Sequence, residues 1–197
     1  MPTRLLRIPT GFVATVPRSS PRRRRRPADR QRARVYRWEQ AVVFPGRDGL
    51  LDLAACRSLV EAVYRWAEAD RAGTPGWAPP RVTDGRGRRH ACGSREVVKL
   101  PRWARTAPIV LHECAHGLAA DQHGPCFVAA YVALLERFLG MDGAALRASL
   151  AAAGIACGEA RYGPAGRLQL RAAQTGRSPR KVMKGSTRPP APKARTS

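Results

Sequence analysis

Acidic residues are scarce in this 197-residue chain, which has 14 Asp and Glu against 36 Lys and Arg and a formal net charge of +22. So basic a balance is unusual for a metabolic enzyme and points first to anionic partners such as nucleic acid. The excess lies at the ends, because residues 1–34 and 161–197 each have a net charge of +10 and residues 35–160 only +2. The charge therefore belongs to two terminal segments around a nearly neutral middle.

Long hydrophobic runs are absent from the sequence. No apolar segment approaches the roughly 20 residues needed to span a bilayer, which excludes an integral membrane protein. The N-terminal segment also lacks a secretory pattern, because its weak apolar stretch at residues 11–16 runs into Pro17 and a block of arginines. We therefore expect a cytoplasmic protein that does not bind a membrane.

Cysteine pairs and nucleotide-binding motifs are missing as well. The five cysteines form no C-x-x-C pair, and their odd number indicates free thiols in a cytoplasmic protein rather than disulfides. There is no glycine-rich nucleotide-binding loop, no nucleophilic serine motif and no internal repeat. The length allows one domain with terminal extensions rather than two domains.

The two basic ends are rich in proline and poor in large apolar residues, so they cannot bury enough surface to offset the entropy cost of folding. We expect residues 1–34 and 161–197 to be disordered tails around a folded domain at residues 35–160. The N-terminal tail contains five consecutive arginines, at Arg22, Arg23, Arg24, Arg25 and Arg26. Such a block either contacts the phosphates of nucleic acid or is a solvated tail without a partner, and the sequence favours neither alternative.

The middle segment begins with a predicted strand, a helix and a sheet. Residues 35–44 are rich in β-branched and aromatic side chains and stop at Pro45, which predicts a strand. Asp52 can cap a helix over residues 53–67, whose apolar positions recur at the spacing of one buried face. Short runs bounded by turn residues predict a small antiparallel sheet with strands at residues 81–83, 88–92 and 96–100.

Three more helices are predicted in the second half of this segment. The first begins near Thr106, with Pro108 in its first turn, where a missing N–H is harmless. The second starts at Pro125 and runs to residue 139, and the third is capped by Asp142 and closed by Gly154. The expected fold is therefore α+β, a compact core in which a small antiparallel sheet packs on helices.

The helix that begins near Thr106 contains the pattern H-E-x-x-H, formed by His112, Glu113 and His116. Residues four apart on a helix project within about 40° of each other, so both imidazoles can bind one metal ion. Glu113 is offset by one residue, which places it to accept a proton from a metal-bound water rather than to bind the metal. The pattern predicts a zinc-dependent hydrolase in which water activated by Glu113 attacks a carbonyl carbon.

A third histidine, His123, follows closely in the sequence D-Q-H-G-P. The glycine and the proline indicate a turn, which can bring His123 back over the metal. Three protein ligands with water in the fourth position are the open coordination of a catalytic zinc site. We therefore expect one Zn2+ per chain, bound by His112, His116 and His123.

These residues resemble a known family. The sequences L-P-R-W-A-R, V-L-H-E-C-A-H and H-G-P-C-F, within residues 100–138, are similar to small bacterial metallohydrolases related to the SprT-like zincins. The resemblance covers roughly two thirds of the chain. It implies a zincin-like core, a peptide or protein substrate, the three histidines as zinc ligands and Glu113 as the catalytic base. Because zincins commonly bind an extended substrate along an edge strand, residues 96–100 or 88–92 are candidates for that contact.

The sequence departs from related families in two respects. The spacing to the third histidine differs by one residue from the metzincin pattern H-E-x-x-H-x-x-G-x-x-H, and the glycine of that pattern is missing. The cysteine-rich zinc ribbon that follows the protease core in SprT-type DNA–protein crosslink proteases is also absent. A role in DNA repair is therefore not implied, whereas the metal site is unaffected.

Other candidate residues have weaker patterns. Tyr131 or Arg105 is a candidate to contact the substrate or to donate to the oxyanion. Cys126 is close enough in sequence to His123 to approach the zinc, but a small buried residue in the core is the favoured interpretation. His90 is expected in a strand beside the cleft, where contact with substrate is the less favoured role.

Two classes of function follow from the sequence. The first is a zinc-dependent hydrolase, most readily a peptidase, that uses Glu113 as its base. The second is a basic nucleic-acid-associated protein in which the zinc centre is structural or catalytically idle and the tails provide the affinity. The sequence identifies no particular substrate and indicates no oligomeric state.

Overall fold

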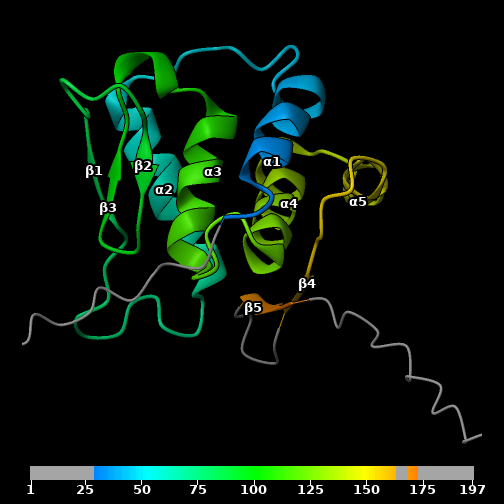
Figure 1. Ribbon diagram of the computed structural model, residues 1–197. Coiled ribbons are helices and arrows are strands. Elements are labelled where there is room, and N and C mark those ends of the chain that lie inside the picture. The colour runs from blue at the N-terminus through cyan, green and yellow to red at the C-terminus, as the bar shows by residue number, and fades with distance from the viewer. Residues whose placement is uncertain (1–28, 163–167, 173–197) are drawn as a thin grey trace, which may run out of the picture.

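The computed structural model describes residues 29–162 and 168–172 (Figure 1). Helix α1 (Arg32–Trp38), π-helix η1 (Glu39–Val43) and helix α2 (Leu53–Ala67) come first, followed by strands β1 (Arg81–Thr83), β2 (Cys92–Gly93) and β3 (Val97–Lys99). The 3-10 helix η2 (Arg102–Ala104) leads into helices α3 (Ala107–Leu118), α4 (Pro125–Leu139) and α5 (Gly143–Ala152), and strands β4 (Glu159–Tyr162) and β5 (Leu168–Arg171) end the fold. The predicted α+β class is confirmed, and no described helix is both long and apolar enough to cross a bilayer.

The first two elements correct the prediction of a strand at residues 35–44. This segment forms α1 and η1, and its buried side chains recur at helical spacing: Val35, Trp38, Glu39 and Val43. The indole N–H of Trp38 donates to Ser149 Oγ at 2.8 Å, which joins this helical segment to α5. The β-branched residues favour a strand only by local propensity, and burial of one helical face outweighs that preference.

The three-stranded sheet is mixed rather than antiparallel as predicted. β3 lies in the middle, with β1 parallel to it on one side and β2 antiparallel to it on the other. The chain between β1 and β2 crosses to the far edge through Gly85 and Gly87, both at positive φ, and of the predicted strand at residues 88–92 only Cys92 is in a strand. A parallel pair requires such a crossover, and strands of two or three residues are too short for an alternation that would indicate it.

Helices α3 and α4 form the centre of the fold. α3 contacts α2, α4 and the edge strand β2 (Figure 1). As predicted, Thr106 precedes its first turn and Pro108 lies within that turn. Residues 110–115 of α3 and residues 127–135 of α4 are all buried. Because α3 takes polar side chains into this interior, each of them needs a partner there.

Helix α5 and the β4–β5 pair complete the fold. Asp142 caps α5 as predicted, since its carboxylate accepts from the backbone N–H groups of Ala144 at 2.8 Å and Ala145 at 3.2 Å. β4 and β5 are antiparallel, and Leu168 of β5 packs against Ala67 and Ala133. The hairpin is therefore attached to both α2 and α4.

Both expected domain boundaries lie inside secondary structure. Residues 32–34 form the first turn of α1, and residues 161–162 and 168–171 belong to the β4–β5 pair. Arginines can lie on the outer side of a helix or of a strand pair. The change in net charge along the sequence therefore does not mark the ends of the folded domain. Residues 1–28, which include the arginines at residues 22–26, and residues 163–167 and 173–197 of the predicted tails lie outside the described residues.

Candidate metal centre

Three histidine rings meet between α3 and the start of α4. His112 and His116 lie one turn apart on α3, with ring centroids 4.9 Å apart. His123, from the turn between α3 and α4, lies 4.7 Å from His116 and 5.3 Å from His112 by the same measure. One ligand nitrogen from each ring lies within 4.8 Å of the others, so the three residues can hold a metal ion. We call these residues the histidine cluster.

The turn that carries His123 is held by its own helix cap and by a residue from the N-terminal segment. Its preceding residue, Gln122, has a φ of 57°, a left-handed conformation that is uncommon for a residue other than glycine. The Asp121 carboxylate then caps α4 by accepting from the backbone N–H groups of residues 126 and 127, at 2.8 and 2.9 Å. The side-chain amide of Gln31 donates to the carbonyl of His123 at 2.7 Å. These contacts fix the orientation of the third imidazole.

Two carboxylates stand behind the histidine cluster. Glu39 Oε1 lies 2.6 Å from Nδ1 of His112, and Asp29 Oδ2 lies 2.6 Å from Nδ1 of His123. With a proton on each Nδ1, both Nε2 atoms are left as acceptors. Among the described residues, Nε2 of His123 is the one buried side-chain polar atom without a hydrogen-bond partner. A buried acceptor of this kind, with a carboxylate on the opposite ring nitrogen, fits a bound metal ion.

Burial keeps two of the three imidazoles neutral. Burial and the neighbouring His112 and His123 lower the pKa of His116 to about 3. Burial also lowers the pKa of His123, against the opposing effect of Asp29. For His112 burial again favours the neutral form, but the hydrogen bond with Glu39 and the negative charges of Glu39 and Glu113 together raise the pKa. Neutral imidazole is the form that binds a metal ion, so His116 and His123 need not lose a proton at pH 7.

Glu113 lies beside the histidine cluster in a tightly packed position. Burial raises the pKa of its carboxyl group to about 6, although His112 opposes this effect. Strand β2 passes directly over this part of α3. The approach is so close that a Cβ added at Gly93 would clash with the backbone carbonyl of Glu113. Glycine therefore allows the edge strand to approach the helix. A carboxylate with a pKa just below neutrality is suited to act as a general base.

A cleft of about 410 Å³ opens onto the first two residues of the H-E-x-x-H motif. One wall comes from α1 and η1 and contains Arg32 and Tyr36. The opposite wall contains Trp103 of η2 and His90, which precedes β2. His90 thus lies beside the cleft as expected, although it is in a bend rather than a strand. We call this cavity the active cleft.

Tyr36 brings a phenol close to the histidine cluster. Its ring centroid is 5.0 Å from that of His123 and 5.8 Å from that of His112. The guanidinium carbon of Arg32 lies 5.2 Å from the Tyr36 ring centroid. Burial raises the pKa of the Tyr36 hydroxyl, so at pH 7 the phenol is a neutral hydrogen-bond donor. Arg32 and Tyr36 are thus polar donors on the wall of the active cleft.

The predicted contacts Tyr131 and Arg105 lie elsewhere. Tyr131 is buried, its ring centroid is 5.5 Å from that of His112, and its hydroxyl donates to the carbonyl of Pro108 at 3.3 Å. Arg105 donates from Nε to the carbonyl of Leu100 at 3.2 Å and does not line the active cleft. Both residues lie near the motif in the sequence. Tyr131 is buried and cannot contact a substrate, and Arg105 lies outside the cleft.

The cysteines near the motif do not join the histidine cluster. Within the described residues, the metal-ligating group consists of the three histidines alone. Cys126 lies in the first turn of α4, half-buried, and packs against the main core. Cys114 is fully buried on α3. The position of Cys126 agrees with its favoured interpretation as a packing residue, and Cys114 likewise packs in the core.

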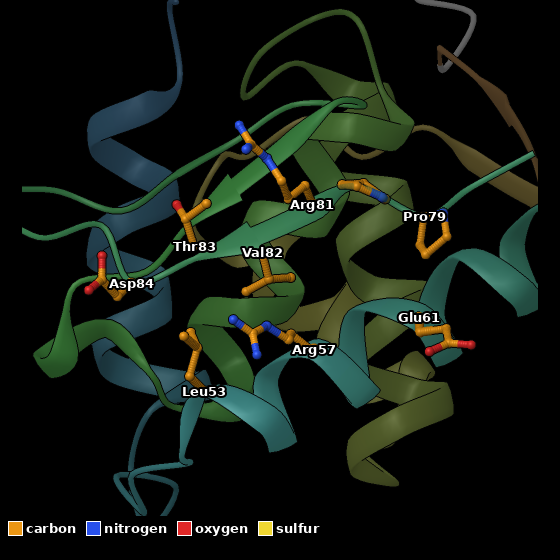
Figure 2. Close-up of a pocket in the computed structure, with 9 residues that line it drawn as sticks. Leu53, Arg57, Glu61, Pro79, Arg81, Val82, Thr83 and Asp84 are labelled. Atoms are coloured by element: carbon orange, nitrogen blue, oxygen red, sulfur yellow. The ribbon is translucent and has the colours of Figure 1, made fainter.

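A larger cavity of about 640 Å³ lies between α2 and β1 (Figure 2). It shares no lining residue with the active cleft, and neither histidine nor cysteine lines it. Its charged groups, Arg57, Glu61, Arg81 and Asp84, stand along an open surface. It therefore offers no imidazole or thiolate ligand for a transition metal.

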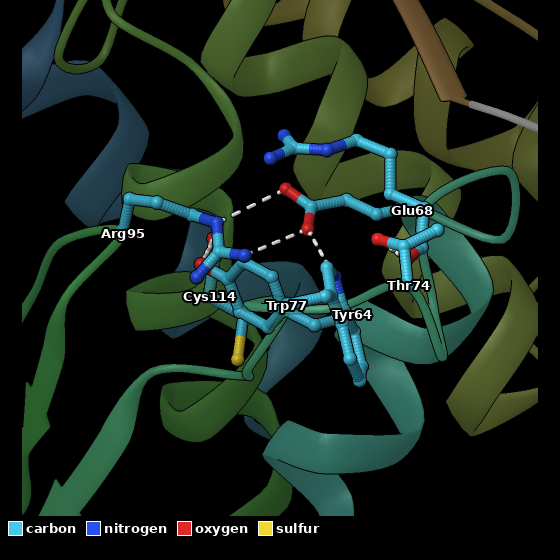
Figure 3. Close-up of polar contacts among 7 residues, drawn as sticks. Tyr64, Glu68, Thr74, Trp77, Arg95 and Cys114 are labelled. Carbon is cyan, nitrogen blue, oxygen red and sulfur yellow. Dashed lines mark hydrogen bonds and ion pairs between the residues drawn. The ribbon is translucent and has the colours of Figure 1, made fainter.

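A polar network braces the edge strand and α3 from the side of α2 (Figure 3). The Glu68 carboxylate accepts from Arg95 at 3.0 and 2.8 Å and from the indole N–H of Trp77 at 2.8 Å. The Arg95 guanidinium also lies 5.0 Å from the ring centroid of Tyr64, whose hydroxyl donates to the carbonyl of Cys114 at 3.2 Å. Arg95 is in the turn after β2, so the network holds both that turn and the helix next to Glu113.

Comparisons with known proteins add no family assignment. No protein-family model, no curated protein and no solved structure matches this chain. The resemblance to the SprT-like zincins therefore stays a prediction from the motifs, and the geometry of the histidine cluster is the evidence available for a function.

Sequence reasoning missed the groups that α1 and its preceding residues bring to the site. Asp29 and Gln31 were assigned to a tail, and Glu39 was assigned to a strand. One signal was present, because Glu39 is the one acidic residue in an otherwise apolar and basic stretch at residues 35–44. A single carboxylate at helical spacing from buried apolar residues lies on the buried face of the helix, which indicates that it has a partner in the interior.

Proposed function

We propose that the protein is a zinc-dependent hydrolase that cleaves peptide bonds. The observation that supports this most strongly is that a buried carboxylate, Glu113, lies next to three converging imidazoles and, together with His112, lines an accessible cleft. Imidazole nitrogens are common zinc ligands, and three protein ligands leave a coordination position open. A closed structural site would need a fourth protein ligand, and the described residues offer none.

The chemistry follows from the placement of these groups. The histidine cluster would hold the zinc, which would supply a Lewis acid that polarises the carbonyl and activates a water molecule. Glu113 accepts a proton from the attacking water and passes it to the leaving nitrogen. A C–O bond forms and the amide C–N bond breaks, so that the hydroxyl of water ends on the acyl carbon and the hydrogen on the amine. Glu39 and Asp29 keep the Nδ1 protons of two ligands in place.

Glutamine at position 113 gives the decisive experiment. The wild-type chain, loaded with zinc, should contain about one zinc per chain by elemental analysis and should hydrolyse casein or a peptide library. The Glu113→Gln variant should keep its zinc and lose hydrolysis, because an amide cannot accept the proton. Glu61→Gln, on the exposed side of α2, is the matched control and should retain activity. Activity that persists in Glu113→Gln would refute the proposal.

Negative charge on the carbonyl oxygen needs donors, and Tyr36 and Arg32 lie on the wall that faces the histidine cluster. We assign them this role in place of the buried Tyr131. Tyr36→Phe removes only the hydroxyl and should lower kcat about 100-fold with zinc content unchanged. Tyr131→Phe should leave kcat near the wild-type value. An unchanged kcat in Tyr36→Phe would remove the phenol from the mechanism.

The alternative function, a nucleic-acid-associated protein with an idle zinc centre, depends on basic segments that lie outside the described residues. Nothing in the described part of the chain favours it over hydrolysis. It predicts salt-sensitive binding of DNA or RNA that is lost when both basic ends are removed. The SprT-like relationship likewise stays part of the proposal, as the source of the expectation that the substrate is a peptide.

A further inference from the structure

The active cleft has aromatic and aliphatic walls in addition to its reactive end. Tyr36 comes from α1, Phe44 follows η1, Trp103 lies on η2 and Ile109 is on α3. These side chains come from two segments of the chain, residues 36–44 and 103–109, so the fold gathers large apolar side chains around one opening. A cavity of about 410 Å³ is within the range of small-ligand sites, which are lined mainly by apolar groups with a few polar ones.

Two of these side chains are exposed to an unusual degree. Among the described residues, three large hydrophobic side chains are exposed: Tyr36 at 39%, Leu50 at 60% and Trp103 at 54%. Tyr36 and Trp103 both line the active cleft, whereas Leu50 does not. The next residue, Ala104, is fully buried, and so is Leu100 just before η2, so the exposed Trp103 belongs to an element that is packed against the core. Exposed aromatic surface that is gathered at a cleft is typical of a ligand-binding groove.

The charges at the active cleft limit what the apolar walls can accept. Glu39 is bonded to His112, and Glu113 is the proposed base, so neither carboxylate is available to a substrate side chain. Arg32 is the permanent cation of the lining, and no carboxylate within the described residues forms an ion pair with it. A lysine or arginine side chain in the cleft would meet a like charge and find no free acid. An uncharged, bulky side chain suits these walls best.

We infer that the active cleft is a specificity subsite for a large apolar side chain, aromatic for preference, next to the bond that is cleaved. The inference rests on the proposed peptidase function and names its substrate class. Burying one such side chain is worth about 1.5–3 kcal/mol, which corresponds to a preference of about 10- to 100-fold in kcat/KM over alanine.

The first experiment uses the zinc-loaded full chain and peptides that differ only at the residues flanking the cleaved bond. Phenylalanine or leucine should raise kcat/KM about 10- to 100-fold over alanine, and lysine should give the lowest value. Trp103→Ala should reduce the preference for phenylalanine about tenfold. Leu50→Ala, which removes the exposed hydrophobic side chain outside the active cleft, is the matched control and should keep the full preference. Thermal unfolding checks that both variants remain folded.

A second measurement does not depend on turnover. Phenylalanine hydroxamate and glycine hydroxamate share the zinc-binding group and differ by the benzyl side chain. In calorimetric titrations of the zinc-loaded wild type, phenylalanine hydroxamate should bind at least about tenfold more tightly, and Trp103→Ala should remove most of this difference.

The outcomes separate the subsite from the proposed function. Peptides with phenylalanine and alanine cleaved at equal rates would overturn the subsite and leave the Glu113-dependent peptidase intact. Tighter binding of phenylalanine hydroxamate without cleavage of any peptide would support the subsite and refute the peptidase. A preference that survives Trp103→Ala, or equal binding of the two hydroxamates, would overturn the assignment of the cleft walls.

Discussion

Two carboxylates decide how the histidine cluster presents its nitrogen atoms. Glu39 and Asp29 each contact Nδ1 of one histidine at 2.6 Å, which directs Nε2 of His112 and His123 away from them. An imidazole free to rotate or to change its tautomer would lose part of its binding free energy to that ordering. The affinity of the site for metal is therefore set by these acids as well as by the ligands.

Replacement of Glu39 by glutamine should weaken zinc binding. The variant keeps the size of the side chain but removes the charge that holds the proton on Nδ1 of His112, so we expect the Kd for zinc to rise about 10- to 100-fold. Competition with a chromophoric chelator measures this Kd directly. Glu61→Gln serves as control and should bind zinc like the wild type. Equal affinities in Glu39→Gln and the wild type would contradict the role of this carboxylate.

The buried carboxyl group of Glu113 should lower the stability of the metal-free protein at high pH. The pKa of Glu113 is about 6 in the fold against an ordinary value of 4.5, so stability falls as the pH rises from 4.5 to 6, and the full loss remains above pH 6. In the presence of a chelator, Glu113→Gln should raise the free energy of unfolding by about 2 kcal/mol at pH 8. Below pH 4.5 the wild-type carboxyl is protonated in both states, and the gain should disappear. Urea unfolding at pH 8 and pH 4 tests this, and an equal gain at both would contradict it.

At the scale of elements, a helix cap can position a metal ligand only when the cap is next to that ligand. Asp121 caps α4 and Asp142 caps α5 through the same kind of carboxylate to N–H bonds. The cap at Asp121 also ends the turn that carries His123, whereas the cap at Asp142 lies at a helix without a ligand. The two caps can therefore be compared directly.

Removal of either cap by alanine should lower the free energy of unfolding by about 1 kcal/mol. Asp121→Ala should in addition raise the Kd for zinc, because the turn before α4 loses its two anchoring bonds and His123 gains freedom. Asp142→Ala should leave that Kd unchanged. Denaturant unfolding and chelator competition on the same two proteins give both numbers. An equal Kd in the two variants would show that the cap does not position His123.

Elements also explain what the sequence predicted well. The helix at residues 53–67, its Asp52 cap and the helix that starts at Pro125 follow from local signals, namely a cap residue, a buried stripe and a proline in the first turn. The pairing of β1 with β3 depends on a crossover between them, and no local signal records which strand lies in the middle of a sheet. The strand predicted at residues 35–44 failed because its burial pattern is set by contacts with α5 and α3.

For the whole molecule, the N-terminal boundary is the most consequential difference. Residue 29 contacts His123, residue 31 holds the same turn, and residues 32–38 form the first helix. A domain that starts at residue 35, as the charge distribution suggests, lacks the contacts made by residues 29 and 31. Net charge divides the chain near this point, but the contacts that build the site cross the division.

Two truncations should show where the functional unit begins. A chain that starts at residue 29 keeps both contacts and should bind zinc like the full chain. A chain that starts at residue 35 should bind zinc at least about tenfold more weakly, because Asp29 and Gln31 are lost. Asp29→Asn in the full chain separates loss of the carboxylate from loss of folding and should weaken zinc binding in the same direction. If both truncated chains and Asp29→Asn bind zinc as tightly as the full chain, this boundary is refuted.

The sequence by itself determined the histidine cluster, because His112 and His116 need only helical spacing to face one another and a glycine and proline next to His123 require a turn. It also determined most helices, whose caps and stripes are local. Only the tertiary structure decided the carboxylates behind the ligands, the donors Tyr36 and Arg32 and the walls of the active cleft. Glu39 and Asp29 lie 73 and 94 residues from His112 and His123, the ligands that they contact, and Tyr36 and Arg32 come from the same N-terminal segment. Contacts over such separations depend on how whole elements pack, and no local pattern of residues records that packing.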